Sequence, residues 1–424
     1  MTTLSRIAFM KPAEVSEVEP QPIRAASYPE RFDPAPPRAT PTGPTQPFAD
    51  GRQNSRLDAA LRDPLSVTWA QRFASPLRPD TRAHSVLQHR DAILVQAPVW
   101  QLFGLNGSPR RAGRAGPSPI VISPDERAFL WVNSDGYLVS APLDTGRTRW
   151  SYGLHLADGA TFPFVGVRGP RVVVVGVEFA GNPEAQPKQA TRLAVEVIEP
   201  GSPVDASPEG ILRSAKTPGA LEVGCAGDAF AAMSDDRVVV AWRDHLLTVG
   251  FDLSTKQLLR GTFEPRAISL GEAGRAYLIV RTSEGPRLWM LNAQGEQVFS
   301  VRLPDDAADT RVPPIITADH RVFVVTDSRI TAFGPMGDQL WEFAPPKGRP
   351  RASVTAEGWL LVAVDDIVGI MDAEGRSATL FQLPGEVFVT APVLTTSGEI
   401  FVATERELVC IGPEFDASHR TIIR

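Results

Sequence analysis

A turn-like landmark recurs along the chain at nearly regular intervals, and a repeat of this kind constrains the fold more than any other feature. Each landmark lies between two strand-like runs and contains Gly, or Lys in one case. One residue marks each landmark: Gly107, Gly146, Gly201, Lys256, Gly295, Gly337, Gly375 and Gly412. Five of the seven intervals are 37 to 42 residues long and two are 55. The spacing predicts eight repeated units, with loop insertions around the third.

Dense apolar runs precede the landmarks, for example residues 128–132 and 238–242. They are rich in β-branched and aromatic side chains and lack the 3.6-residue spacing of a helix, which predicts strands buried on both faces. A further strand lies on each side of the landmark, as in 340–343, and a leading strand such as 118–121 opens the unit. Four antiparallel strands per unit of about 40 residues are typical of a β-propeller blade.

The last unit is one strand short, because only twelve residues, 413–424, follow its landmark and none of them is Trp. The missing strand has a counterpart near the N-terminus. Residues 65–73 match the outer strand 339–343, but no apolar inner strands precede them. We therefore predict an all-β, eight-bladed propeller that is closed by the N-terminal strand 65–73, which completes the last blade and removes an open edge.

Residues 1–64 differ in composition from the rest of the chain. They hold eleven of the 39 prolines, eight basic and eight acidic residues, and few apolar ones. Such a segment cannot bury enough surface to offset its ordering entropy, so we expect a disordered, Pro-rich N-terminal arm. The predicted domains are this arm, the propeller over 65–415 and a C-terminal tail over 416–424.

The segment from Gly136 to Gly146, followed by Trp150, resembles the repeat of quinoprotein-like (PQQ-like) eight-bladed propellers. The resemblance covers residues ~65–415 and is clearest over 117–154 and 312–346. It implies the fold but not the activity, since that superfamily includes both dehydrogenases and protein-binding scaffolds. A WD-repeat ring is the rival within propellers, but the Trp-Asp dipeptide and the Gly-His pair that mark it are absent.

The resemblance is to a non-catalytic member. Dehydrogenases of that family typically have a vicinal Cys pair, a Trp beneath the quinone and a set of calcium ligands. Here the two cysteines are Cys225 and Cys410, which are expected as buried small side chains, and no calcium set can be matched. The sequence also lacks the usual hydrolase, phosphate-loop, dinucleotide and zinc motifs. No catalytic, cofactor-binding or metal-binding residue is therefore assigned, and no cofactor is expected.

Three acidic pairs are the remaining candidates for chemistry: Asp235-Asp236, Asp305-Asp306 and Asp365-Asp366. They could hold a metal ion or act as acid and base at the channel mouth. Turn chemistry is the favoured interpretation, because adjacent residues in a strand point to opposite sides and cannot converge on one ion. The six histidines are scattered singly, which favours surface or capping roles.

Composition limits the partners and the location. Lys and Arg number 43 against 49 Asp and Glu, so the net charge of −6 provides no basic field for nucleic acid. No stretch approaches eighteen apolar residues, so membrane insertion is not expected. The N-terminus has no hydrophobic core of signal-peptide length, and two cysteines suit a reducing compartment. These features predict a cytoplasmic protein.

The sequence therefore favours a non-enzymatic interaction scaffold, a subunit or assembly factor of a larger complex, whose protein partner is unknown. Ile7, Phe9 and Met10, in an apolar island of the arm, are expected to contact that partner. In fold type the scaffold resembles the barrel-assembly subunit of the bacterial outer membrane, a lipoprotein whose N-terminal lipid-accepting Cys has no equivalent here. The alternative is a small-molecule-binding or PQQ-dependent oxidoreductase-type propeller that uses the central channel.

Overall fold

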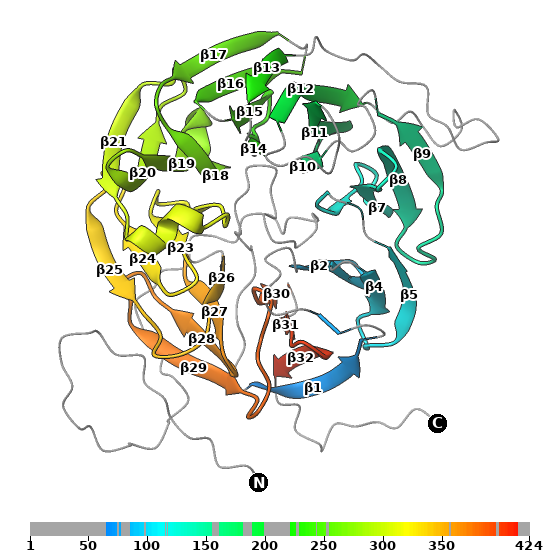
Figure 1. The fold of residues 1–424 in the computed structure, drawn as a ribbon. Coiled ribbons are helices and arrows are strands. Elements are labelled where there is room, and N and C mark those ends of the chain that lie inside the picture. The colour runs from blue at the N-terminus through cyan, green and yellow to red at the C-terminus, as the bar shows by residue number, and fades with distance from the viewer. Residues whose placement is uncertain are drawn as a thin grey trace, which may run out of the picture.

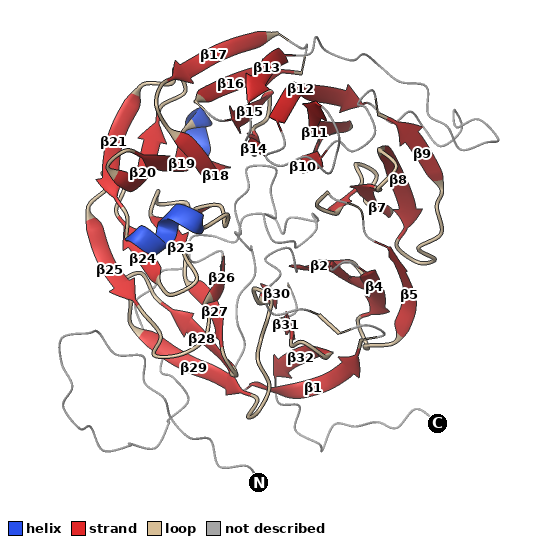
Figure 2. Cartoon of the chain, in the orientation of Figure 1, coloured by secondary structure: helices blue, strands red, loops and turns tan. Residues whose placement is uncertain are grey.

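Eight four-stranded antiparallel sheets are arranged as a ring in the computed structural model (Figure 1). The structure describes residues 65–413 apart from short gaps. The gaps are 74–75, 78–84, 97–98, 115, 117, 155–160, 181–188, 199–220, 226–228, 243, 252–253, 356–357 and 396–397. Each sheet is one blade, and consecutive strands of a blade run from the centre of the ring to its rim (Figure 2). The predicted eight-bladed propeller is confirmed.

Blades one to four are named in chain order. Their strands are β2 (Ser85–His89), β3 (Ala92–Gln96), β4 (Val99–Gly104) and β5 (Pro109–Arg114); β6 (Val121–Ile122), β7 (Ala128–Val132), β8 (Tyr137–Pro142) and β9 (Trp150–Gly153); β10 (Thr161–Arg168), β11 (Arg171–Ala180), β12 (Gln189–Ile198) and β13 (Leu221–Cys225); and β14 (Ala229–Met233), β15 (Arg237–Trp242), β16 (His245–Gly250) and β17 (Thr255–Arg260). Loop insertions are predicted around the third unit. Part of its extra length lies instead in two long strands, β11 and β12, and the connecting residues 181–188 and 199–220 lie outside the described part of the chain.

Blades five to eight complete the ring. Their strands are β18 (Glu264–Leu270), β19 (Ala276–Thr282), β20 (Gly285–Leu291) and β21 (Gln297–Arg302); β22 (Ile315–Ile316), β23 (Val322–Val325), β24 (Ile330–Phe333) and β25 (Gln339–Phe343); β26 (Arg351–Val354), β27 (Leu360–Val364), β28 (Ile367–Met371) and β29 (Ser377–Gln382); and β30 (Val393–Leu394), β31 (Ile400–Ala403), β32 (Glu407–Pro413) and β1 (Leu65–Arg72). Two short 3-10 helices, η2 (Glu272–Gly274) and η3 (Asp305–Asp309), lie in connections. Neither described helix has the length and apolar character needed to cross a bilayer.

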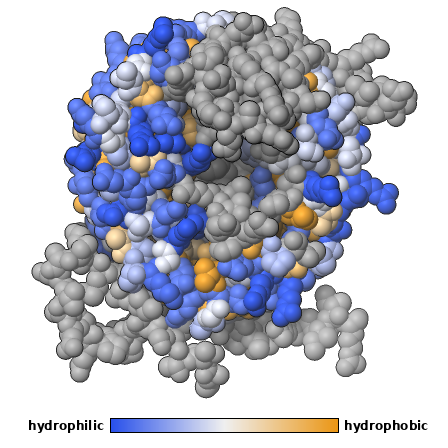
Figure 3. All heavy atoms as spheres, viewed as in Figure 1, coloured by the Kyte–Doolittle hydropathy of each residue, from blue (hydrophilic) through white to orange (hydrophobic). Residues whose placement is uncertain are grey.

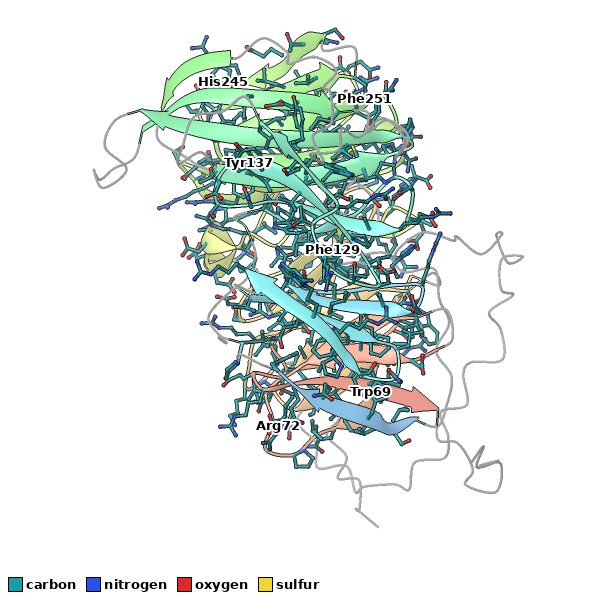
Figure 4. All side chains as sticks on the ribbon, turned by 90° about the vertical axis from the view of Figure 1, so that its right-hand side faces the viewer. Trp69, Arg72, Phe129, Tyr137, His245 and Phe251 are labelled. Atoms are coloured by element: carbon teal, nitrogen blue, oxygen red, sulfur yellow. The ribbon has the colours of Figure 1, made fainter. Side chains whose placement is uncertain are left out.

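The ring closes where β1 pairs antiparallel with β32, as the sequence predicts. Leu65 lies opposite Pro413 and Arg72 opposite Glu407, and the side chains of that second pair form an ion pair with 3.2 Å between Nε and Oε1. Figure 4 shows Trp69 and Arg72 on β1 at the edge of the molecule. Because the outer strand of blade eight comes from the opposite end of the sequence, the first and the last strand that the structure describes are held together.

The hydrophobic core is divided into eight clusters, each between two neighbouring blades. Phe129 in β7 faces blade one, for example, whereas Leu130 faces blade three. Side chains on both faces of the inner strands are therefore buried, which explains why those strands lack the alternation of apolar and polar residues.

Outer strands pack on the turn glycine of the next blade. An added Cβ would lie 2.7 Å from the Trp69 ring at Gly107 and 2.7 Å from the Trp341 ring at Gly375. Both glycines have positive φ, +79° and +78°, so the turn requires the conformation and the contact leaves no room for a side chain. Each indole Nε1 also donates to a carbonyl of that turn at 2.9 Å.

Most sequence landmarks fall in the turn between the third and fourth strands, as predicted for Gly107, Gly146, Gly295, Gly337 and Gly375. Lys256 lies just after that turn, in β17. The landmark at position 201 and the arm residues 1–64 lie outside the described residues. The eighth landmark is wrong as a turn: residues 411 and 412 lie inside β32, because the connection they would make is replaced by the break between β32 and β1.

The alternating strand directions give the ring two different faces. The terminal face carries the first-to-second and third-to-fourth turns of each blade and the paired positions Leu65 and Pro413. The opposite face carries the second-to-third turns and the connections between blades. Phe251 lies on the terminal face and His245 on the opposite face (Figure 4).

Candidate functional site

The three acidic pairs each lie in a connection between strands, where their carboxylates have local partners. In the β14–β15 turn, Asp236 accepts a hydrogen bond from Ser234 at 3.0 Å and pairs with Arg237 at 2.6 Å. The hydrogen bond from Arg237, above all, holds the pKa of Asp236 below its usual value. Asp235 pairs with Arg168. Turn chemistry accounts for this pair.

The second and third pairs lie on the opposite face. Burial would raise the pKa of Asp306, but hydrogen bonds from Ser328 and Thr326, and the charge of Arg329, lower it overall. Its neighbour Asp305 also lies in η3, so this pair occupies a 3-10 helix and not a simple turn.

In the third pair, Asp365 faces Lys347 at 3.4 Å and Asp366 accepts from Gln382 at 3.0 Å. Among the residues that the structure describes, no three His, Cys, Asp or Glu side chains come together as a metal site would require.

His89 is the one buried histidine among those described, and it joins two blades. It lies at the end of β2 with 3% of its surface exposed, and its Nε2 donates to the carbonyl of Glu126 in blade two at 3.0 Å. The Glu126 carboxylate pairs with Arg90 at 3.2 Å. Burial lowers the pKa of His89, which keeps the ring neutral. Its contacts indicate a structural polar clasp between blades one and two.

Cys410 is fully buried in β32, opposite Trp69. Burial, followed by the charge of Glu399, raises the pKa of this thiol to about 12, so it is a buried small side chain as predicted, not a nucleophile. Cys225 lies in β13, and its side chain is outside the described residues.

A cleft of about 250 Å³ opens between blades four and five on the terminal face. The floor of the cleft is apolar. Small residues line its walls, because the two turns of blade five contribute glycines and alanines. The small residues are Gly271, Ala273, Gly274, Ala276 and Ala293. The volume is below that of a typical small-molecule site, about 300–1,000 Å³. The charged groups at its edge, Asp235, Asp236 and Arg237, are already in ion pairs.

An exposed apolar surface lies at the rim of blades five and six, and we name it the rim patch. It consists of Val298 in β21 and Met336 and Leu340 in blade six, which are 46%, 73% and 42% exposed. The turn that carries Met336 packs against β21, since a Cβ at Gly337 would lie 2.9 Å from the Phe299 ring. Phe299, the residue after Val298, lies against the turn that carries Met336. Leu340 follows that turn in β25, so the three exposed side chains belong to adjoining elements of two blades.

Several charged side chains elsewhere on the surface form local pairs, such as Arg110 with Asp91 at 2.6 Å and Arg149 with Asp125 at 3.2 Å. The opposite face is mostly hydrophilic, with apolar atoms in small islands (Figure 3). Tyr137, which is 45% exposed at the start of β8, is an example of an isolated exposed ring. The rim patch differs in having three exposed apolar side chains on adjoining elements of two blades.

The predicted contact residues Ile7, Phe9 and Met10 lie outside the described residues, so the structure does not place them. The sequence interpretation missed the rim patch, although a signal was present. Three residues after the turn glycine, blade one has Arg110, whereas blades five and six have Val298 and Leu340. An exposed rim strand does not require an apolar residue at this position, so Val298 and Leu340 indicate a contact surface.

Comparison with solved structures supports the same architecture. BamB from Moraxella catarrhalis is 13% identical, with 82% of this chain and 99% of that chain covered and a TM-score of 0.55. Quinohemoprotein alcohol dehydrogenase from Comamonas testosteroni is 11% identical, with 88% and 81% covered and a TM-score of 0.59. A europium-containing methanol dehydrogenase is 10% identical, with 88% and 98% covered and a TM-score of 0.57.

These likenesses show the fold. It is an eight-bladed β-propeller, as the repeat predicts, and it is similar to the propellers of these quinoprotein-like structures. No protein-family model and no curated protein matches the sequence. At such identities, proteins with one fold can differ in activity, so the function has to be argued from this chain's own surface.

Proposed function

We propose that this protein is a non-enzymatic interaction platform that acts as a subunit or assembly factor of a larger protein complex. The observation that carries the proposal is the rim patch, because exposed apolar side chains gathered on one part of a surface and bordered by polar residues are typical of protein-binding surfaces. Met336, at 73% exposure, is the most exposed large apolar side chain among the described residues.

The frame suits this role. Eight interblade cores and the β1–β32 closure hold the rim turns on packed sheets, so a partner meets a preformed surface and little ordering entropy is lost on binding. Ile7, Phe9 and Met10 of the arm remain proposed as a second contact, which would bind by ordering on the partner. A cytoplasmic location is part of the same proposal.

The test is co-purification from the native cell followed by mass spectrometry, with the full chain and a double variant, M336D/L340D. Placing two carboxylates in an apolar interface should lower partner recovery at least tenfold, as expected for loss of central apolar contacts worth about 2 kcal/mol or more. The matched control is Y137D, which changes an isolated exposed ring and should recover the partner normally. Equal recovery by all three proteins would reject the rim patch as the binding surface.

A spectroscopic titration addresses the enzymatic alternative. The purified protein is mixed with PQQ and calcium, and the absorbance of the quinone is followed. The proposal expects no saturable change. A saturable quinone band would overturn the non-enzymatic assignment and favour the oxidoreductase alternative.

A further inference from the structure

The rim patch has an acidic border and no basic residue within its two turns. Residues 292–300 and 334–341 form those turns and the adjoining strand starts, and they contain Glu296 and Asp338 but no Lys or Arg. Both acidic residues are exposed. A complementary ligand would be a short apolar segment with basic residues on its flanks.

One segment of this chain has that chemistry. In Ser5-Arg6-Ile7-Ala8-Phe9-Met10-Lys11, four apolar residues lie between two basic ones. We propose that residues 6–11 of the arm bind the rim patch of the same molecule, with Ile7, Phe9 and Met10 against Val298, Met336 and Leu340, and with the flanking cations near Glu296 and Asp338. The inference rests on the proposed function, because the arm would cover the same surface that is proposed to bind the partner.

The chain is long enough for this contact. The arm joins the propeller at Leu65, which lies on the terminal face, the same face as the turn that carries Met336. Along the rim, β29 and β25 follow β1 on the side of the patch (Figure 1), so blade six is two blades away from blade eight. With sheets packed about 10 Å apart at the centre and diverging outward, that distance is on the order of 20–40 Å.

Residues 12–64 provide 53 residues of linker. An unstructured chain of this length has a root-mean-square span of about 40 Å, which prolines increase, and its extended length is about 170 Å. A linker whose average span matches the distance gives an effective concentration in the millimolar range. Even a weak segment would then occupy the patch for most of the time.

The consequence is competition. A protein that binds the rim patch must displace residues 6–11, and the displaced island becomes free to contact the same partner. The arm would thus act as a built-in competitor that weakens binding of ligands lacking a second contact for the island, which raises specificity.

Trypsin provides the test on the purified full chain, without any partner. It cleaves the Arg6–Ile7 bond inside the island and the Arg24–Ala25 bond in the linker, while Lys11 precedes Pro12 and is resistant. The ratio of the two cleavage rates is measured for the wild type, for M336D/L340D and for a synthetic peptide of residues 1–30. With millimolar effective concentration and a dissociation constant near 0.1 mM, we expect about tenfold slower cleavage at Arg6 in the wild type than in the peptide.

The patch variant should cleave like the peptide, and the control Y137D like the wild type. The milder single change M336S, with an unchanged melting temperature, should give intermediate protection and keeps the test valid if the double variant misfolds. Equal rates in wild type and peptide would overturn the proposal, as would protection unaffected by the patch changes. Protection that disappears on dilution would mean binding to a second copy and would also overturn it. None of these results changes the outcome of the co-purification test, so failure of this inference can be distinguished from failure of the proposed function.

Discussion

Two of the junctions between neighbouring blades, which we call seams, have the same geometry but different origins. At the junction of blades six and seven, Trp341 packs on Gly375 and its Nε1 donates to the Ala373 carbonyl at 2.9 Å. At the junction of blades eight and one, Trp69 packs on Gly107 and donates to Leu105 in the same way. The first Trp belongs to a blade built from continuous chain, whereas the second sits on a strand recruited from the other end of the sequence.

The difference lies in connectivity and burial. Trp341 is 5% exposed, whereas Trp69 is only partly buried and its strand has no covalent turn to β32. The closing strand therefore depends on hydrogen bonds and on its docked ring. The same local contact therefore serves two purposes: it connects neighbouring blades, and at β1 it also locks the whole ring.

Removal of residues 1–75 should have the largest effect on this comparison, because it deletes the closing strand and its Trp. Roughly five ladder hydrogen bonds at ~1 kcal/mol each, together with the lost ring contacts, are comparable to the stability of a typical domain. We expect little soluble monomer by size-exclusion chromatography. Removal of residues 1–60 spares β1 and is the control. A truncated chain lacking 1–75 that melts at the wild-type temperature would refute the closing role.

This closure was accessible from the sequence because blade spacing is fixed by backbone hydrogen bonding. The last unit lacks a Trp-containing outer strand, and residues 65–73 form such a strand without a unit of their own, so the two must pair. The predicted segment 65–73 agrees with β1, which is Leu65–Arg72. Neither the clasp of His89 with Glu126 nor the rim patch was predicted.

Both missed features join residues about 40 positions apart on neighbouring blades. A single blade's pattern specifies its own strands, but it contains no information about which side chain of the next blade lies opposite. The turn containing Met336 was therefore interpreted as a landmark alone. Its role in a surface becomes visible only when Val298 of the preceding blade is placed beside it.

Alanine substitution of the two tryptophans should distinguish the stability contributions of the two seams. W341A removes a buried ring and should cost about 3–5 kcal/mol, whereas W69A removes a partly exposed one and should cost about 2–3 kcal/mol. Urea unfolding followed by circular dichroism gives both values. If W69A proves the more costly change, ring closure carries more of the stability than local burial indicates, and the two seams are not equivalent.

Two glycine substitutions test the docking contact itself. G385A adds a methyl group in open space at a φ of +86°, so it should cost only the backbone strain of about 1 kcal/mol. G375A has a similar φ but also pushes the methyl group into the Trp341 ring, which should add about 1–3 kcal/mol. Equal destabilisation in urea would show that Trp341 shifts without penalty and that the contact is loose.

The polar clasp between blades one and two should give the smallest and most specific effect. Burial lowers the pKa of His89 below its ordinary value of 6.5, while Glu126 and Asp91 oppose this and Arg90 assists it. A group whose pKa is depressed in the folded state contributes its full stability at pH values above its unfolded-state pKa. That contribution is lost as the pH falls through its folded-state pKa. Wild-type stability should therefore decline below pH 6.5, before the acidic side chains titrate.

H89Q keeps a donor toward the Glu126 carbonyl but cannot titrate, so its stability should change less over the same interval. Unfolding in urea at a series of pH values measures the two slopes. Parallel slopes would mean that protonated His89 is accommodated through Glu126, whose carboxylate lies 3.9 Å from Nε2. The clasp would then resemble an ion pair, and this seam would differ from the tryptophan seams in charge as well as in shape.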